Sequence, residues 1–463
     1  TAIALLACSR NGYVCCPSLH RDHTVAEIVA LIDRMRAAAL IAMPGWGADA
    51  DRRDVFDALA DRDFLRWIYR VGPAEAAPFA DLSGAGAAFP ASRDANQIMY
   101  LPFTSGTTGT PKGALHSDNT LLAAARMMAR DWRLEGAVLC TLSPLSHNLG
   151  LGAFVTALCG GGELVVHDLP RGCSLVDRLS ETGAAFLFGV PTHAVDLLAE
   201  MRARSIRRLG AVRGFRISGA AAPAQLVEEL LDHGVVPQSG YGMTETCSHH
   251  YTLPDDPVER IALSCGRACA GYEIRIWRQD DPDVAAAPGE VGEIGGRGAS
   301  LMLGYFDDQR ATEAAFNREG WFMTGDLGRI DEAGYLRITG RKKDVIIRGG
   351  RNIHAAPIEA LALRHAAVER AAAFAVADPR LGERVCLALV PRPGMALDPQ
   401  AILQHLDRAG LSRYDMPEFI LPLAELPLTA SGKVLKRELV RRVAEGRARP
   451  IEVRFRPVAA TEG

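Results

Sequence analysis

The chain has 463 residues, enough for roughly two to four domains, and its 48% hydrophobic and 23% charged residues are ordinary for a soluble globular protein. A formal net charge of −3 predicts no nucleic-acid partner, and no apolar run approaches the roughly 18 residues of a membrane span, so no stable membrane insertion is expected. The ten cysteines are scattered without a CxxC pair, so we expect reduced thiols and a cytoplasmic protein.

The first hundred residues alternate helical and strand patterns. Apolar residues recur at helical spacing over 24–38, which predicts a helix. The short apolar run 39–45 ends in Pro-Gly and predicts a strand. A further predicted strand, 98–103, runs straight into the glycine-rich stretch TSGTTGTPKG, residues 104–113.

The glycine-rich stretch has the composition of a phosphate-binding loop. It combines three glycines, five hydroxyl side chains and one lysine, and glycine permits the backbone conformations in which successive N–H groups form an anion nest. It is not a GxxxxGK[ST] P-loop, because Gly106 and four further residues are followed by Pro111-Lys112-Gly113. The stretch therefore predicts a phosphate site of a different kind.

Strand, small-residue loop and helix then repeat to about residue 260. A helix is expected over 119–132. Strands are expected over 137–144, 162–168, 184–191, 214–220 and 234–242. Such alternation predicts an α/β fold with a sheet covered on both faces and with ligands at the carboxyl ends of the strands.

The sequence pattern changes after about residue 260. Short strands with Gly-rich turns (YEIRIW, GEVGEIGG and GYLRITG) predict a β-rich region. A charged turn and two glycines, GRKKDVIIRGG (340–350), lead into a compact α/β pattern, so we place a domain boundary near 341. In that pattern helices are expected over 357–368 and 398–410, and strands over 370–378 and 384–391. The basic and then polar tail, 441–463, is expected to be a frayed surface end.

Seven motifs in a fixed order, from about residue 95 to about 440, resemble the adenylate-forming superfamily. This superfamily contains acyl-CoA and aryl-CoA ligases, aryl-acid adenylating enzymes, adenylation domains and luciferases. TSGTTGTPKG resembles its phosphate loop, and PLSHNLGLG (144–152) resembles its acyl-site helix start. The remaining motifs are the adenine and phosphate segments SGAAAP and YGMTE, the ribose motif WFMTGDLG, the hinge GRKKDVIIRGG and the lysine motif LPLTASGKVLKREL.

The resemblance implies a two-step reaction. A carboxylate attacks the α-phosphorus of ATP to give acyl-AMP and pyrophosphate, and the thiol of coenzyme A then displaces AMP. It also implies Mg²⁺, which prefers one or two carboxylates together with phosphate oxygens. The implied fold is a large N-terminal domain of layered α/β sheets with a β-rich subdomain, and a small mobile C-terminal α+β domain. The bounds are 1–340 for the large domain, 341–343 for the hinge, 344–440 for the small domain and 441–463 for the tail.

The implied nucleotide site spans most of the motifs. Lys433 is the expected catalytic lysine, Thr244 contacts the α-phosphate, Glu245 is the Mg²⁺ ligand and Lys343 is the hinge. The other implied residues are Thr104, Ser105, Gly106, Thr107, Thr108, Gly109 and Lys112 for the phosphates, Gly219, Ala220, Ala221, Tyr241 and Gly242 for adenine, Asp326 and Arg341 for ribose, and Gly349 and Gly350 for the thiol tunnel.

The resemblance implies fewer residues for the acid pocket than for the nucleotide site. His147 is expected to line it and gate the thiol, and the other expected lining residues are Asn148, Val190, Gly219 and Met243. Apolar walls of this kind suit a medium-chain, alicyclic or aromatic acid. The run PLSHNLGLG…GGGELVVHDL and the stretch PKGALHSDNT most resemble medium-chain and cyclohexanecarboxylate-type CoA ligases.

Several of these residues have a purely structural alternative when they are taken singly. Tyr241 is then a packed core aromatic, His147 a satisfied buried histidine and Asp326 a turn residue beside a glycine. Arg341 would belong to a solvated turn, and Lys433 would be an ordinary surface lysine.

Three departures from the family pattern are visible. The family has N-terminal strands and helices before the position of Thr1, so we expect the chain to be truncated relative to it. Ala355 and Pro357 stand where relatives usually have Pro and Glu, beside the thiol route. Asp118 occupies the place of a common histidine, with His116 two residues earlier.

Three other functions remain open at this point. A stand-alone aryl-acid adenylating enzyme would load a carrier protein instead of coenzyme A. A noncatalytic relative would bind nucleotide without releasing pyrophosphate, and a luciferase-like enzyme would oxidise the acyl-AMP. A monomer or a homodimer is expected in each case.

Overall fold

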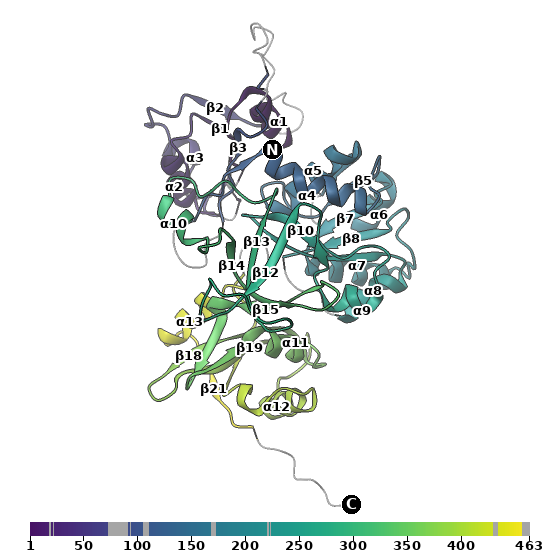
Figure 1. Cartoon of the computed structure of the whole chain (residues 1–463), viewed down its shortest axis with the longest axis vertical. Coiled ribbons are helices and arrows are strands. Elements are labelled where there is room, and N and C mark those ends of the chain that lie inside the picture. Colours follow the sequence, from purple (N-terminus) through teal and green to yellow (C-terminus); the bar gives the residue numbers. More distant parts are fainter. Residues whose placement is uncertain are drawn as a thin grey trace, which may run out of the picture.

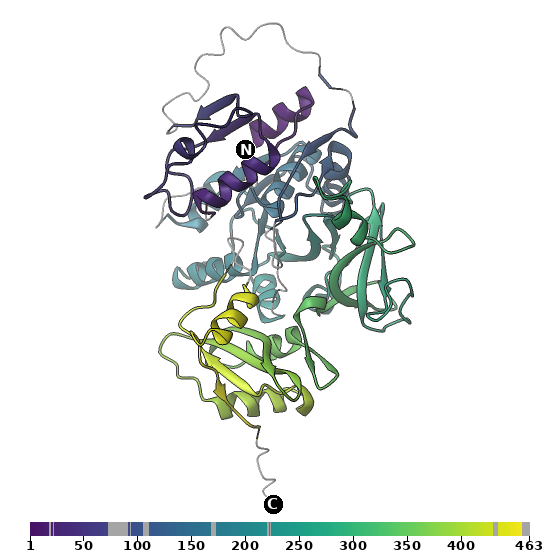
Figure 2. The same ribbon diagram turned by 90° about the vertical axis from the view of Figure 1, so that its left-hand side faces the viewer.

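The computed structural model describes residues 1–17, 20–21, 23–72, 91–92, 94–104, 111–167, 173–219, 222, 224–428 and 434–455. The molecule is elongated, with the first helices and strands at one end and the C-terminal elements at the other (Figure 1). A view at right angles shows the same order, with the β-rich strands on one side of the central sheet (Figure 2).

The N-terminal elements form a small layer of their own. Their bounds are α1 (Ala2–Asn11), α2 (Val25–Met35), β1 (Ala39–Ala42), α3 (Val55–Ala58) and β2 (Trp67–Arg70). The side chains of Thr24 and Glu27 each accept the other's backbone N–H and so fix the start of α2. β1 and β2 pair in parallel, and their core is built around Ile28, Leu40 and Phe56. The predicted helix and strand of this region are confirmed.

The central sheet has seven strands in the order β11-β10-β9-β8-β7-β5-β6. Their bounds are β5 (Val138–Thr141), β6 (Glu163–Val166), β7 (Phe186–Gly189), β8 (Gly214–Ile217), β9 (Val236–Met243), β10 (Cys247–Tyr251) and β11 (Arg267–Ala268). β5 to β9 run parallel, and β10 and β11 extend the sheet as an antiparallel edge. All five strands predicted in this region are present.

Helices cover both faces of the central sheet, as the alternation predicts. They are α4 (Asp118–Asp131), α5 (Asn148–Gly160), α6 (Leu175–Thr182), α7 (Pro191–Ala203), α8 (Ala224–Asp232) and α9 (Val258–Leu263). α6, α7 and α8 share one core with β5, β7 and β8. α4 and α5 pack in a second core, around Trp132 and Phe186. β3 (Ile98–Tyr100) and β4 (His116–Ser117) pair on either side of the glycine-rich stretch.

The β-rich region is a four-stranded antiparallel sheet. It consists of β12 (Tyr272–Trp277), β13 (Gly292–Gly298), β14 (Phe322–Ile330) and β15 (Leu336–Arg341), in that spatial order, with α10 (Gln309–Ala314) between β13 and β14. The strands predicted after residue 260 are thereby confirmed. The last strand ends at Arg341, where the predicted hinge begins.

The C-terminal elements have a separate core. They comprise η1 (Lys342–Asp344), β16 (Val345–Arg348), β17 (Arg351–His354), α11 (Ala355–Ala362), β18 (Val368–Asp378), β19 (Gly382–Pro391), α12 (Pro399–Arg408), η2 (Arg413–Asp415), β20 (Phe419–Pro422), α13 (Lys436–Ala444) and β21 (Ile451–Glu452). The buried residues Ile358, Leu387 and Leu403 join helices to the sheet. A small α+β domain therefore follows the large α/β one, which confirms the predicted fold class.

Part of the tail predicted to be frayed, 441–455, contains regular secondary structure. α13 continues to Ala444, and β21 pairs antiparallel with β20 through Phe419–Glu452 and Ile420–Ile451. Arg384 also donates to the Glu452 carboxylate at 2.7 Å. The edge of β20 offers unpaired backbone groups, and these give the tail a partner that its polar composition does not reveal.

The cysteines and the helices can be compared with what the composition predicts. None of the ten cysteines forms a disulfide bond in the structure. Within the described ranges, no helix is long and apolar enough to cross a membrane.

Candidate active site

Four neighbouring parallel strands end at one edge of the central sheet. The register pairs Thr141 with Phe188, and it pairs Ile217 with both Gly189 and Ser239. The segments that follow these strands therefore meet at the same edge, because parallel strands share the direction of their carboxyl ends. All five predicted acid-pocket residues lie in or directly after those segments: His147, Asn148, Val190, Gly219 and Met243. The chain order switches direction between β5 and β7, which is where ligands bind in open α/β sheets.

The predicted ribose residue Asp326 holds two predicted neighbours. The hydroxyl of Tyr241 donates to Oδ2 of Asp326 at 2.8 Å, and Nε of Arg341 lies 3.0 Å from Oδ1. Asp326 and Arg341 face each other in the β14–β15 register. The Tyr241 ring is buried and nearly perpendicular to the ring of His249, and burial together with the Asp326 charge raises the pKa of its phenol well above the usual value. The structure thus brings Tyr241, Asp326 and Arg341 into one cluster.

Glu245 and Lys112 meet through a residue that sequence reasoning missed. Tyr305 donates to Oε1 of Glu245 at 3.0 Å, while Nζ of Lys112 lies 4.8 Å from the centre of the same ring. Glu245 is 7% exposed, and burial raises the pKa of its carboxyl while the bond from Tyr305 and the Lys112 charge oppose that shift. In sequence Tyr305 is one aromatic after a glycine in a loop, and no spacing rule singles it out.

His116, rather than Asp118, reaches the predicted phosphate segment. Nε2 of His116 lies 2.8 Å from the carbonyl oxygen of Thr244, and Nδ1 lies 3.1 Å from Oγ1 of Thr120. Since a carbonyl only accepts, Nε2 carries the proton in this contact. The imidazole is fully buried, and burial lowers its pKa to about 4. Asp118 instead accepts from the hydroxyl of Ser9 at 2.9 Å.

The two ends of the predicted phosphate loop are fixed against each other. The backbone N–H of Thr104 donates to the carbonyl of Lys112 at 2.8 Å. Nη1 of Arg34, on α2, donates to the carbonyl of Pro111 at 2.5 Å, and its guanidinium lies over the Phe103 ring. The predicted loop residues Ser105, Gly106, Thr107, Thr108 and Gly109 lie outside the described residues. The described ends hold Lys112 beside Tyr305.

A cavity lies between α4, α5 and β10, next to one predicted acid-pocket residue. Nδ2 of Asn148 donates to the carbonyl of Met243 at 3.1 Å, which ties the start of α5 to the segment that carries Thr244. The cavity has about 20 Å³ of free space. Its lining is mostly apolar: Leu121, Ala124, Ala125, Met128, Asn148, Leu151, Gly152, Val155, Thr156, Cys247 and Ser248. Of these lining residues, only Asn148 was predicted from the sequence. The α4 residues lie far along the chain from the acyl-site motif PLSHNLGLG, so the motif does not indicate them.

The other predicted acid-pocket residues surround the same sheet edge. His147 is the N-cap residue of α5. The backbone N–H of Val190, the N-cap residue of α7, donates to Nδ1 of His193 at 3.3 Å. Gly219 has φ of 90°, in the left-handed region that favours glycine. Ala220 and Ala221, predicted at the adenine, are not among the described residues.

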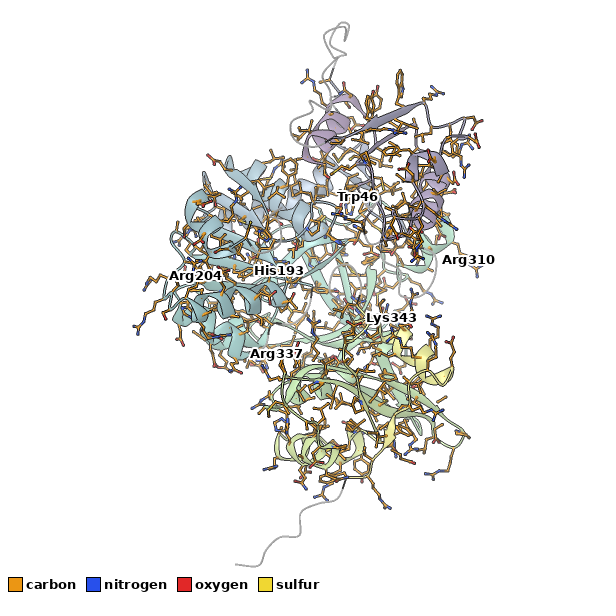
Figure 3. All side chains as sticks on the ribbon, turned by 180° about the vertical axis from the view of Figure 1, so that it is seen from behind. Trp46, His193, Arg204, Arg310, Arg337 and Lys343 are labelled. Atoms are coloured by element: carbon orange, nitrogen blue, oxygen red, sulfur yellow. The ribbon has the colours of Figure 1, made fainter. Side chains whose placement is uncertain are left out.

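The predicted hinge lies where the C-terminal domain meets the rest of the chain (Figure 3). Lys343 sits in the short η1 turn, and burial lowers the pKa of its ammonium. Its neighbour Lys342 pairs with the buried Glu293 of β13 at 2.7 Å, and Glu293 also accepts from the backbone N–H of Gly325, beside the ribose motif. The chain segment at the hinge is therefore tied directly to the predicted nucleotide site.

The predicted thiol loop and lysine motif lie in the small domain. Gly349 and Gly350 form the turn between β16 and β17, both with positive φ. Lys433 falls outside the described residues. The chain on either side of its loop pairs through Leu428 and Val434. Just beyond it, Lys436 contacts Glu359 at 2.7 Å and Asp344 at 3.8 Å.

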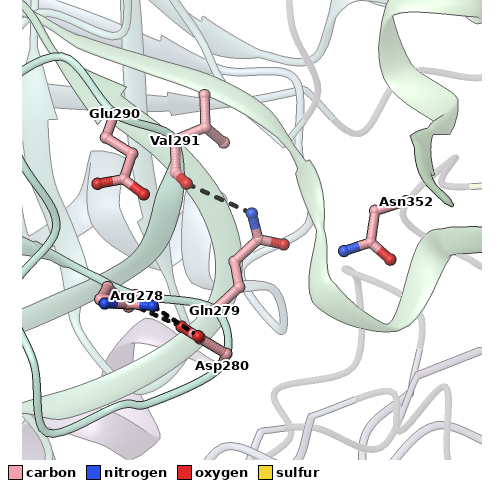
Figure 4. A pocket seen from close by; sticks show the side chains of 6 residues that line it. All are labelled: Arg278, Gln279, Asp280, Glu290, Val291 and Asn352. Carbon is pink, nitrogen blue, oxygen red and sulfur yellow. Dashed lines mark hydrogen bonds and ion pairs between the residues drawn. The ribbon is translucent and has the colours of Figure 1, made fainter. Parts of the chain in front are cut away.

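A second groove opens between the β12–β13 connection and the small domain. It is an open groove with about 360 Å³ of free space, lined by Arg278, Gln279, Asp280, Glu290, Val291 and Asn352. Figure 4 shows Gln279 bonded to the carbonyl of Val291 on one side and Asn352 of β17 on the other. These lining residues include none of the predicted site residues, so this groove is separate from the sheet edge.

Glu245 is the residue predicted to hold Mg²⁺. In the part of the chain that the structure describes, no group of three or more His, Cys, Asp or Glu side chains could hold a metal ion. Glu245 is a buried carboxylate that forms no ion pair within the described residues. One carboxylate suits Mg²⁺ when phosphate oxygens of a bound substrate complete the coordination.

Two protein-family models match parts of this chain. Residues 1–306 match the family model described as AMP-binding enzyme. Residues 357–433 match the model described as AMP-binding enzyme C-terminal domain. The chain belongs to the AMP-binding enzyme family. The first match covers the N-terminal layer, the central sheet and the strands β12 and β13, and the second lies within the small domain. The expected superfamily is thereby confirmed.

Curated relatives of this AMP-binding enzyme are CoA ligases. It is 35% identical over 364 residues to a medium-chain fatty-acid–CoA ligase of Escherichia coli strain K12, which covers 77% of this chain and 64% of that enzyme. It is also 35% identical over 457 residues to a methyl-dioxo-octahydroindenyl-propanoyl:CoA ligase of Mycobacterium tuberculosis, covering 94% and 85% of the two chains. An indoleacetate–CoA ligase of Aromatoleum aromaticum is 37% identical over 350 residues, covering 75% and 67%.

Solved structures of similar fold include nucleotide complexes. ATP-bound MatB from Rhodopseudomonas palustris superposes with a TM-score of 0.79 at 28% identity, covering 91% of this chain and 82% of that one. An o-succinylbenzoate CoA synthetase from Bacillus subtilis, in complex with its acyl-adenylate intermediate, gives 0.76 at 26% identity, covering 90% and 81%.

Proposed function

We propose that this AMP-binding enzyme is an AMP-forming acid–thiol ligase. It converts a carboxylic acid and ATP to acyl-AMP and pyrophosphate, and then transfers the acyl group to the thiol of coenzyme A with release of AMP. The observation that carries the proposal is the meeting of Lys112 and Glu245 at Tyr305, at the edge of the sheet where the acid-pocket segments also end. A phosphate-binding cation and a buried carboxylate are thereby held beside one another.

In the first step the chain must neutralise the phosphates and fix the ribose. Lys112 and the loop that begins at Thr104 hold the departing pyrophosphate, while Thr244 contacts the α-phosphate. Asp326 accepts from the ribose hydroxyls, since a carboxylate has about four lone-pair sites and Tyr241 and Arg341 use only two of them. Lys433 brings its ammonium to the charge that develops between the carboxylate and the α-phosphorus.

Glu245 fits the role of the Mg²⁺ ligand. Its carboxylate is buried, it forms no ion pair within the described residues, and burial raises its pKa. A divalent cation next to it would relieve that desolvation and, when bound, would neutralise phosphate charge. Tyr305 keeps one oxygen of Glu245 oriented, which leaves the other to face the phosphates.

The acid is proposed to be of medium size and largely apolar, either medium-chain, alicyclic or aromatic. The cavity beside Asn148 has mostly apolar walls, which suit such an acid, and its free space of about 20 Å³ would have to widen for the acid to enter. The relatives named above act, by their names, on a medium-chain fatty acid, a bicyclic propanoic acid and indoleacetate. His147, Val190 and Gly219 are proposed to complete the acid pocket at the sheet edge.

The second step is proposed to use the small domain. We place the large domain at 1–340, the hinge at 341–343 and the small domain at 344–440. Rotation at Lys343 would withdraw Lys433 and bring the Gly349–Gly350 turn to the thiol route. The CoA-ligase names of the relatives favour free coenzyme A over a carrier protein. A cytoplasmic monomer or homodimer is part of the same proposal.

The experiment is AMP release with ATP, Mg²⁺ and a panel of carboxylic acids, each with and without coenzyme A. The panel runs from short to long fatty acids and includes cyclohexanecarboxylate, indoleacetate and hydroxybenzoates. Turnover that requires coenzyme A supports the ligase and ranks its acids. Acid-dependent pyrophosphate exchange without a response to coenzyme A would point to carrier-protein loading, and ATP binding without either reaction would overturn the proposal.

A further inference from the structure

A histidine from the N-terminal region packs against the predicted gate residue. The ring of His20 stacks on the ring of His147, with centroids 4.2 Å apart and planes inclined by 12°. Nδ1 of His20 also lies 3.1 Å from Oγ of the adjacent Ser146, so the two side chains share a hydrogen bond. His20 thus contacts two consecutive residues that lie more than a hundred positions away in the sequence.

The surroundings of His20 fix its ring. The side chain is 8% exposed, and His23 lies edge-on to it at 5.0 Å. Burial, with smaller contributions from His147 and His23, lowers the pKa of His20 to about 3, so its ring is neutral at physiological pH. A neutral, buried and hydrogen-bonded imidazole is a rigid stacking surface rather than a proton carrier.

The stacked partner is placed where its orientation matters. His147 is the N-cap residue of α5, and the next residue, Asn148, both lines the cavity and bonds to Met243. His147 is not among the residues that line this cavity, but under the proposed function its ring lines the acid pocket, so a change in the direction of the ring would change the space available to the acid. His20 restricts that direction from one face of the ring and, through Ser146, from the backbone turn before it.

We propose that His20 is a positioning residue for the acid and thiol side of the site, which holds the His147 ring in one orientation through the stack and through the Ser146 hydrogen bond. The kinetic part of this inference rests on the proposed function. The structural part, that His20 shields and orients His147, does not. His20 acts through His147 and leaves the ATP phosphates and ribose untouched.

The structural part is tested by chemical modification, which needs no activity. The rate at which diethyl pyrocarbonate modifies His147 is measured by mass spectrometry of its peptide, with His233 as an internal reference. His20→Ala is expected to raise this rate severalfold, whereas His20→Phe, which keeps a stacked ring, leaves it near the wild-type value. His365→Ala, which removes a histidine packed at a steep angle against His405 in the small domain, is the matched control and leaves the rate unchanged. Equal His147 rates in wild type and His20→Ala would overturn the proposal.

The kinetic part is tested on the acid and on ATP separately. Loss of one stacked pair and one hydrogen bond corresponds to roughly two- to tenfold each, so kcat/KM for the acid is expected to fall about tenfold in His20→Ala with the KM for ATP unchanged. His20→Phe restores most of the loss, and Ser146→Ala reproduces part of it. A parallel fall for acid and ATP would indicate a general structural role and overturn the assignment. If the wild-type protein turned over no acid, the proposed function would fail while the modification result still decided the His20–His147 contact.

Discussion

The hydroxyl of Tyr305 donates a hydrogen bond of 3.0 Å to Oε1 of Glu245, and the same ring lies beneath the ammonium of Lys112. One aromatic side chain therefore sets the distance between a cation and a carboxylate that come from different parts of the chain. The backbone supports the arrangement, because the N–H of Met302 donates to the carbonyl of Glu245. Tyr305 connects the phosphate loop to the proposed Mg²⁺ ligand.

Replacement of Tyr305 by phenylalanine removes the hydrogen bond and keeps the ring below Lys112. Because hydrogen bonds to charged groups contribute about 1.5–3 kcal/mol, kcat/KM for ATP is expected to fall roughly tenfold or more, with a higher Mg²⁺ requirement. ATP- and Mg²⁺-dependence of AMP release measure both effects. Tyr335→Phe is a matched control, because its hydroxyl bonds Asp256 outside the site. An unchanged Mg²⁺ titration would contradict the link to Glu245.

Asp326 is expected to be sensitive to loss of charge. Asp326→Asn removes the ion pair with Arg341 and weakens the bond from Tyr241, so it should raise the KM for ATP by roughly ten- to a hundredfold. Steady-state kinetics and direct ATP binding give the effect. Asp331→Asn, at the end of the same strand and paired with Arg260, is the control. An equal effect of the two substitutions would show that general weakening of this sheet, and not ribose recognition, is being measured.

His116 predicts a pH dependence of stability with a defined sign. Its pKa is about 4 in the folded chain against 6.5 for a free imidazole, so the unfolded chain binds more protons between these values. The free energy of unfolding therefore falls as pH falls from about 6.5 to 4, by up to roughly 3 kcal/mol from this group alone. Denaturant unfolding at several pH values, compared with His116→Gln, isolates the contribution.

The His116→Gln variant is informative because glutamine retains an N–H donor for the Thr244 carbonyl but does not titrate. Its stability should decline less than that of the wild type over the same pH range, while other buried histidines, such as His250, titrate in both proteins. If the free energy of unfolding fell equally with pH in the two proteins, the pH dependence could not be assigned to His116.

Lys433 separates the two half-reactions. Lys433→Ala is expected to abolish acyl-AMP formation and to leave thioester formation from supplied acyl-AMP largely intact, because its ammonium serves only the first transition state. Pyrophosphate release and single-turnover thioester formation are measured separately. Lys436→Ala, which loses the Glu359 contact beside the same motif, should instead affect both steps through stability. Equal loss of both steps in Lys433→Ala would be inconsistent with this role.

Local sequence patterns were enough to predict many of the helices and strands of this protein. The helical spacing of 24–38, the strand–loop–helix repeats and the Gly-rich strands after 260 became α2, the central sheet and the β12–β15 sheet. These patterns reflect which residues an element buries, and such periodicity is a property of short segments. The motif chemistry likewise indicated Asp326 and Glu245, which the fold places in two adjoining clusters.

Contacts between distant segments were decided by the tertiary structure alone. Tyr305 beneath Lys112, His116 on the Thr244 carbonyl and His20 on His147 each join residues that no spacing rule connects. The pairing of β21 with β20 turned part of a polar tail into a strand for the same reason. Sequence by itself fixed which elements form and which chemical groups are available. Packing decided which of these groups touch, because side-chain contacts across a fold depend on the arrangement of whole elements and not on local composition.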